Sequence, residues 1–102
     1  MTGRRRALLA QLFDVTEAET PYGGRSASYE PMGYAWLKVG LVRRRARGEA
    51  GTEALAETLA AEARRDARLE NGRMLRFDGA DWRIVSGETV GGRALLNLER
   101  AR

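Results

Sequence analysis

The sequence of 102 residues contains no cysteine and no histidine. Without cysteine the chain cannot form a disulfide bridge or a thiolate metal site. Without histidine it lacks the commonest general base and the commonest metal ligand. Most classes of hydrolase and metalloenzyme are therefore excluded. We expect a protein that is not an enzyme, with no catalytic residue, no cofactor and no metal site.

Long apolar runs are also missing. No stretch approaches the roughly 20 apolar residues that cross a bilayer. The basic N-terminus is not followed by the apolar segment and small-residue cleavage site of a signal peptide. From these features we expect a cytosolic origin and no membrane partner.

Lysine is nearly absent, since Lys38 is the only one and the other 17 of the 18 basic residues are arginine. The formal net charge is +4. Guanidinium groups bind carboxylates and phosphates bidentately, which suits protein interfaces as well as nucleic acid, and the base composition of the source genome explains the bias equally well. With 43% hydrophobic and 31% charged residues, the composition predicts one globular domain over residues 1–102.

The clearest local signal lies at residues 73–86, where two alternating apolar runs meet at Asp78-Gly79. An Asp-Gly pair in this setting is a strong hairpin signal, because both central residues of a type I′ turn need φ > 0. Trp82 and Ile84 share one face of the second arm, so we expect them in the core. A connection at residues 87–92 and a final strand at 93–99 follow.

The first half of the chain predicts strands separated by a long connection. Residues 7–13 favour a strand over a helical turn, and residues 14–26 predict a loop because they contain Pro21 and Gly23-Gly24. Two further strands are expected at residues 26–32 and 33–41, with Trp36 in the core. The acidic first half of the loop is either solvated or in contact with a basic neighbour.

The middle of the chain carries four arginines within five residues, Arg43, Arg44, Arg45 and Arg47. The following residues 52–59 are rich in Ala, Leu and Glu and favour a short helix with Thr52 as its N-cap. Residues 60–69 fit either an extension of this helix or a strand. The arginines would then lie at a strand-to-helix junction, where they either neutralise phosphates or form a solvated basic turn.

Together these elements predict a mainly β fold, a small β-barrel or sandwich with one inserted short helix and long loops. One function open to such a domain is non-specific binding of RNA or DNA by a free-standing basic β-barrel. The two Trp, three Tyr and two Phe are needed for the core. This leaves few aromatic rings to stack on single-stranded bases.

The order of features resembles the head-tail joining, or head-completion (stopper), proteins of tailed phages, and in particular their relatives in gene transfer agents. A short N-terminal strand is followed by a loop ending in Tyr22-Gly23-Gly24 and by the strand Trp36-Leu37-Lys38-Val39. An acidic, alanine-rich segment follows at residues 53–57, and the pattern ends with residues 74–84 and a closing leucine-rich strand. The resemblance covers most of the chain.

The resemblance implies a β-barrel with an inserted helix, residues 60–65 being a strand after that helix. It also implies a homo-oligomeric ring, expected to be hexameric, in the neck of a bacteriophage virion or gene transfer agent particle assembled in the bacterial cytoplasm. Such a ring lies between the portal or adaptor ring and the tail terminator or tail tube proteins, where it seals the DNA exit channel. Two sets of contact residues follow from the resemblance. The candidate contacts to the DNA channel, packaged DNA or neighbouring subunits are Arg43, Arg44, Arg45 and Arg47, and the candidate assembly loop comprises Glu17, Glu19, Tyr22, Gly23, Gly24 and Arg25.

Overall fold

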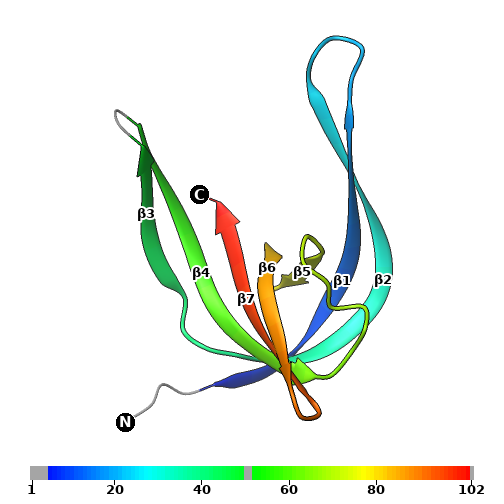
Figure 1. The fold of residues 1–102 in the computed structure, drawn as a ribbon, viewed down its shortest axis with the longest axis vertical. Coiled ribbons are helices and arrows are strands. Elements are labelled where there is room, and N and C mark those ends of the chain that lie inside the picture. The colour runs from blue at the N-terminus through cyan, green and yellow to red at the C-terminus, as the bar shows by residue number, and fades with distance from the viewer. Residues whose placement is uncertain (1–4, 50–51, 102) are drawn as a thin grey trace.

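The chain folds into a single antiparallel sheet of seven strands (Figure 1). The computed structural model describes residues 5–49 and 52–101, and the side chains of residues 5–44 and 56–100. Over those ranges the fold is mainly β, with no helix, and so with none that could span a membrane. The strands are β1 (Arg6–Glu19), β2 (Arg25–Val39), β3 (Arg43–Glu49), β4 (Thr52–Arg64), β5 (Met74–Phe77), β6 (Ala80–Val90) and β7 (Arg93–Ala101).

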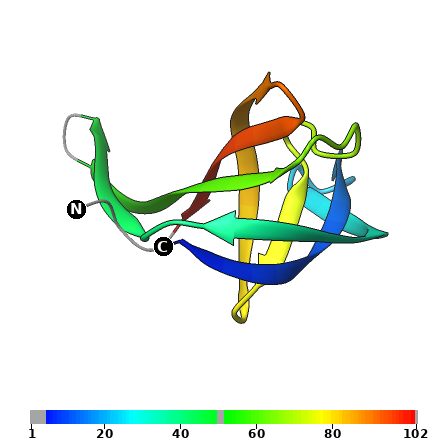
Figure 2. The ribbon, with the colours of Figure 1, turned by 90° about the horizontal axis from the view of Figure 1, so that it is seen from below.

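The sheet closes on itself. Its strand order is β2-β1-β5-β6-β7-β4-β3, and β2 additionally pairs with β4. The closing ladder is short, since only residues 37–39 of β2 pair with residues 61–63 of β4. β3 lies outside this ring, because its pairing is with β4 alone among the described strands. Figure 2 shows the ring from the side on which β2 and β4 approach each other.

The core fills the inside of the ring. Within the ring, alternate residues of the strands point inward, as the period of two requires. Phe77 and Trp82 stack with their ring centroids 5.9 Å apart and their planes 8° apart. The core cluster consists of Ala10, Leu12, Leu37, Val39, Leu59, Ala61, Ala63, Leu75, Phe77, Trp82, Ile84, Ala94, Leu96 and Leu98.

The hairpin predicted at residues 73–86 is confirmed. β5 and β6 pair up to Phe77 and Ala80, and the two turn residues between them have positive φ, 52° at Asp78 and 72° at Gly79. Trp82 and Ile84 are both in the core. The final strand is also confirmed, but the connection predicted at residues 87–92 is mostly strand, because β6 continues to Val90.

The predicted inserted helix at residues 52–59 is wrong. These residues belong to β4, which is a strand from Thr52 to Arg64. β4 pairs with β3 on one side and, from Ala56 onward, with β7 on the other. Helix propensities differ by less than about 1 kcal/mol per residue, so two ladders of strand pairing override them. The helix cap proposed for the side chain of Thr52 lies outside the described side chains.

The segment at residues 60–69, for which the sequence left helix and strand open, is part of strand β4 as far as Arg64 and is irregular beyond it. The inward residues Leu59, Ala61 and Ala63 alternate with outward ones, as a strand requires. The four arginines of residues 43–47 therefore lie on strand β3 and not at a strand-to-helix junction.

The long loop predicted at residues 14–26 is also wrong. β1 continues to Glu19 and β2 begins at Arg25, so only residues 20–24 form the turn. The predicted break at residues 31–33 is absent as well, because β2 is one continuous strand. Pro31 pairs with Phe13 beside a register shift, and on its other side β2 has no strand partner at this point, so the proline lies at an edge and an irregularity, where strands tolerate it.

Arg68 closes the free edge of β2 just before the closing ladder begins. Its guanidinium donates hydrogen bonds to the backbone oxygens of Met32 (2.8 Å) and Tyr34 (3.0 Å). Asp66 accepts hydrogen bonds from the same guanidinium, at 2.7 Å from Nη2 and 3.1 Å from Nε. Gly33 has a φ of 94°, and a Cβ there would lie 3.1 Å from Nη1 of Arg68. This position therefore requires glycine both for its backbone and for the space that Arg68 occupies.

The ion pair between Asp66 and Arg68 makes stability dependent on pH. The hydrogen bonds from Arg68 lower the pKa of Asp66 below its ordinary value of 3.8. A carboxyl group with a lowered pKa in the folded state stabilises the fold above its unfolded pKa, and this contribution is lost as the pH falls through the folded pKa. We predict that Asp66→Asn lowers the free energy of unfolding at neutral pH and that the difference from the parent shrinks below pH 3.8.

Urea denaturation followed by circular dichroism across this pH range measures the difference. Glu88→Gln is the matched control, because Glu88 is exposed and forms no ion pair in the described structure. A deficit of the Asp66→Asn protein that stays constant at every pH would show that its carboxylate charge does not contribute.

Candidate assembly surfaces

Two arms of two strands each project beyond the closed part of the sheet. In Figure 1 they rise on either side of the carboxyl end of β7. The β1–β2 arm comprises residues 14–30, which lie past the last pairing of β1 with β5. The β3–β4 arm comprises residues 43–58, where β3 pairs with the first half of β4. The arms hold both sets of contact residues predicted from the sequence.

The β1–β2 arm is acidic and exposed. It contains four carboxylates, Asp14, Glu17, Glu19 and Glu30, against one cation, Arg25. Every residue from 21 to 30 is exposed, and Tyr22 at the tip is 97% exposed. The six predicted assembly residues therefore lie in the turn and in the strand ends beside it, and their role in assembly remains a prediction.

The tip of this arm has a defined turn. The backbone N–H of Thr20 donates a hydrogen bond to the backbone oxygen of Gly24 (2.8 Å). The backbone N–H of Gly23 donates one to the backbone oxygen of Thr20 (3.1 Å). Below the tip, Glu17 forms ion pairs with Arg25 (3.6 Å) and with Arg83 of β6 (3.2 Å). Glu19 forms no ion pair in the described structure. The tip therefore presents one uncompensated carboxylate beside one exposed ring.

The β3–β4 arm carries the arginine cluster on an edge strand. Arg43 and Arg44 are exposed, whereas the side chains of Arg45 and Arg47 lie outside the described set. Arg44 lies 3.6 Å from Glu57, and Arg43 forms no ion pair among the described side chains. The structure thus brings the cluster to a strand edge, and its contact with DNA or with a neighbouring subunit remains a prediction.

A buried ion pair fixes the base of this arm to the core. Glu57 is only 5% exposed and accepts a hydrogen bond of 2.6 Å from Nε of Arg100 on β7. The guanidinium of Arg100 in turn lies over the ring of Trp82, 5.3 Å from its centroid. These contacts line a cavity of about 230 Å³ at this end of the ring. The position of the arm is therefore coupled to the packing of Trp82.

The prediction that Trp36 lies in the core is wrong, since this side chain is 69% exposed. The inward positions of β2 are Ala35, Leu37 and Val39, so the alternate positions face solvent. Tyr34 shares the outward face and is 58% exposed. The sequence shows the alternation but not which face is inside. That choice is made where β2 meets the small residues of β4.

Trp36 borders a groove at the point where β2 and β4 separate. The groove has a volume of about 540 Å³, and sequence reasoning did not identify it. Arg5 and Arg93 both pair with Glu62 there, at 2.7 and 3.4 Å. Lys38 and Arg64 form no ion pair among the described residues. We call this site the Trp36 groove, and its main outer lining residues are Tyr34, Trp36, Lys38, Glu62, Arg64 and Arg93.

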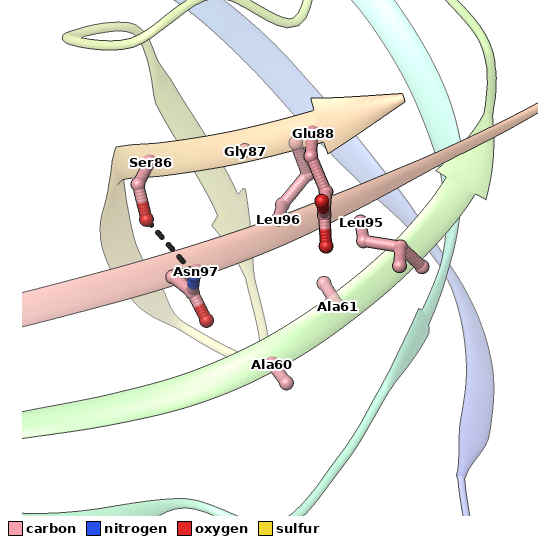
Figure 3. A pocket seen from close by; sticks show the side chains of 8 residues that line it. All are labelled: Ala60, Ala61, Ser86, Gly87, Glu88, Leu95, Leu96 and Asn97. Atoms are coloured by element: carbon pink, nitrogen blue, oxygen red, sulfur yellow. Dashed lines mark hydrogen bonds between the residues drawn. The ribbon is translucent and has the colours of Figure 1, made fainter. Parts of the chain in front are cut away.

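A second hollow lies on the outer face of β4, β6 and β7 and has a volume of about 400 Å³ (Figure 3). Figure 3 shows Ser86 and Asn97 directed toward one another, where the amide of Asn97 donates to Ser86 Oγ at 2.8 Å. β7 approaches Gly87 closely, since a Cβ there would lie 3.0 Å from Cδ2 of Leu96 and 3.2 Å from the backbone oxygen of Leu95. Glu88 is the one charged residue of its described lining. The Trp36 groove is thus the basic and aromatic hollow of the two.

The carboxylates near the hairpin turn have structural partners. Asp81 pairs with Arg76 at 2.6 Å, and Asp78 pairs with Arg6. In the part of the chain that the structure describes, no three acidic residues are grouped so that they could hold a metal ion. The chemistry that these surfaces offer is therefore contact through charge, aromatic rings and strand edges.

We predict that Arg100→Ala destabilises the fold by about 2 kcal/mol, because it leaves the buried Glu57 without its closest cation and uncovers Trp82. Arg100→Lys retains the charge and should lose less. Thermal unfolding of the purified variants gives the values. Arg93→Ala removes an exposed ion pair and should change stability by no more than about 0.5 kcal/mol. Equal losses at the two positions would contradict a special role for the buried pair.

Comparison with known proteins gives matches among solved structures. No family model matches the chain, and no curated protein sequence does. A chain of the native gene transfer agent virion has a TM-score of 0.69 at 14% identity, and the match covers 97% of this chain and 96% of that chain. The protein xkdH of the phage-like element PBSX from Bacillus subtilis has a TM-score of 0.57 at 10% identity, with coverage of 94% and 96%. The resemblance in the sequence is thus confirmed at the level of fold: the chain has the fold of proteins from a gene transfer agent particle and from a phage-like element.

Proposed function

We propose that this protein is a structural component of the neck of a phage virion or gene transfer agent particle. It forms a homo-oligomeric ring between the portal or adaptor and the tail, seals the DNA exit channel and joins head to tail. The observation that supports this best is the fold shared with a chain of the gene transfer agent virion over nearly the full length of both chains.

The arms suit a protein that acts through assembly. A two-stranded ribbon without a third strand or a packed face is marginally stable by itself, yet residues 14–30 extend well past the core. Contact with neighbouring subunits would cover these residues. We therefore expect the purified protein to be monomeric alone and to form a ring on its partner, the portal or adaptor.

The exposed arginines of β3 suit a channel that holds DNA. Arg43 has no ion pair among the described side chains, and the chain has a net charge of +4. Phosphate contacts of this kind carry no sequence information, as befits a channel through which the whole packaged molecule passes. Contact with packaged DNA in this role is non-specific.

Particles made without this protein test the proposal. We predict heads that package DNA but then lose it and carry no tails, because neither the exit channel nor the tail attachment site is complete. Negative-stain electron microscopy and measurement of nuclease-resistant DNA give the two readouts. Restoring the parent gene is the control. Tailed particles that retain their DNA in its absence would overturn the proposal.

The exposed rings favour one other function, the binding of RNA or DNA outside a particle. Tyr34 and Trp36 lie on the surface beside Lys38, whereas the sequence had suggested that the aromatic residues were needed for the core. Glu62 and Asp66 interrupt the positive charge of this surface. A groove that tracks a nucleic-acid backbone is positive along its length, so the neck protein remains our proposal.

Salt dependence of binding separates the two functions. A free-standing binder should retain single-stranded DNA at physiological salt, and alanine at Arg43, Arg44, Arg45 and Arg47 should reduce the slope of log affinity against log salt by about 3. For a neck protein we predict binding at low salt only. Fluorescence anisotropy with a labelled oligonucleotide measures both.

A further inference from the structure

The tip of the β1–β2 arm has the properties of a binding element. The ring of Tyr22 is 97% exposed, and the carboxylate of Glu19 beside it forms no ion pair in the described structure. The turn below the ring is closed by hydrogen bonds between Thr20 and Gly24. The tip therefore presents an aromatic ring and negative charge on a defined backbone.

The Trp36 groove has the opposite properties. It offers an exposed indole, a second ring at Tyr34, and a volume of about 540 Å³. Of its charged lining residues, four are basic and two are acidic. Lys38 and Arg64 are the two cations without an ion pair among the described residues. The groove is therefore suited to an aromatic side chain with carboxylates beside it.

We infer that the tip of the β1–β2 arm of one copy docks into the Trp36 groove of a second copy. Tyr22 stacks against Trp36, since aromatic pairs gain more than their buried area alone provides. Glu19 meets Lys38 and Arg64. The two cations of the groove that form no ion pair among the described residues thus face the uncompensated carboxylate of the tip.

The occupant is a second copy, because the arm cannot reach the groove of its own chain. The tip and the closing ladder lie at opposite ends of the molecule in Figure 1, whose longest extent is 46 Å. Along β2, Leu37 in the ladder lies twelve positions after Arg25 at the tip. Twelve steps of an extended strand span roughly 40 Å. A tip-to-groove contact is heterologous, so its repetition generates a ring or a helical array.

This inference rests on the proposed function in one respect. The proposed ring needs a head-to-tail contact between subunits, and the tip and the Trp36 groove are the two surfaces inferred to make it. The chain has no cysteine, so a disulfide between two introduced cysteines reports a contact between those two positions alone. We mix full-length Tyr22→Cys with full-length Lys38→Cys under mild oxidation and follow disulfide-linked dimers on non-reducing gels. Covalent trapping accumulates even short-lived contacts.

We predict that this pair crosslinks at least tenfold faster than Tyr22→Cys mixed with Val85→Cys. Val85 is the matched control, because it is 40% exposed and lies on β6, across the ring from β2.

In the Lys38→Cys chain, Trp36→Ala should return the rate to the control value. Since Trp36 is exposed, this change leaves the fold intact, and circular dichroism verifies that. In the Tyr22→Cys chain, Glu19→Lys should slow crosslinking, whereas Glu88→Lys should not.

A double variant, Tyr22→Cys with Lys38→Cys, tests the direction of the contact. Head-to-tail docking gives a ladder of products beyond the dimer, whereas two copies that exchange arms reciprocally stop at the dimer. A ladder supports the inference, and products that end at the dimer overturn it. Crosslinking no faster than with Val85→Cys also overturns it and assigns the groove to another occupant.

These outcomes are distinguishable from failure of the proposed function. Crosslinking is measured on the purified chain and requires no particle. Tailed, DNA-retaining particles made without the protein would remove the neck role and leave a measured tip-to-groove contact standing. Tailless particles together with control-level crosslinking would retain the neck role and reject this contact.

Discussion

The rest of the structure depends on the three-residue ladder that joins β2 to β4. This ladder closes the sheet with only three residues of each strand, and two of the three that β4 contributes are Ala61 and Ala63. Small side chains at these inward positions let the two strands approach while Leu37 and Val39 fill the interior. Closure at this point decides which face of β2 is inside. Trp36 and Tyr34 are on the surface as a direct consequence.

Closure also explains the arms. The strands that form the ring are longer than the ring needs, so β1 and β2 continue together on one side and β3 and β4 on the other. The excess length of the β1–β2 arm pairs only within its own hairpin, whereas residues 56–58 of β4 also pair with β7. Where β2 leaves the ladder, the side chain of Arg68 satisfies two backbone oxygens that a further strand would otherwise have met. This part of the edge of β2 is therefore less open to pairing with a foreign strand.

Local signals predicted those parts of the fold in which sequence neighbours interact. The turn at Asp78-Gly79, the core positions of Trp82 and Ile84 and the final strand all follow from short-range patterns. The helix expected at residues 52–59 fails because β4 pairs with the preceding strand β3 on one side and, from Ala56 onward, with the remote strand β7 on the other. The loop expected at residues 14–26 fails because Pro21 and the glycines mark only the tip of a long hairpin. The sequence pointed to the arginines and the acidic segment as candidate contact residues, and their roles remain predictions. It could not identify the Trp36 groove, which exists only where two strands separate after closure.

Charge is divided between surfaces that closure places far apart. Carboxylates predominate on the β1–β2 arm, and the described side chains include cations that form no ion pair with one another, namely Arg43 on the β3–β4 arm and Lys38 and Arg64 beside the groove, nor with any other described residue. Charges of opposite sign that cannot meet within one molecule favour contact between molecules in a defined orientation, because like-charged surfaces repel in the alternative arrangements. The arms supply reach, and the closed sheet holds each surface in place. The proposed neck function would require such control of orientation, and the positions of these surfaces follow from where the sheet closes.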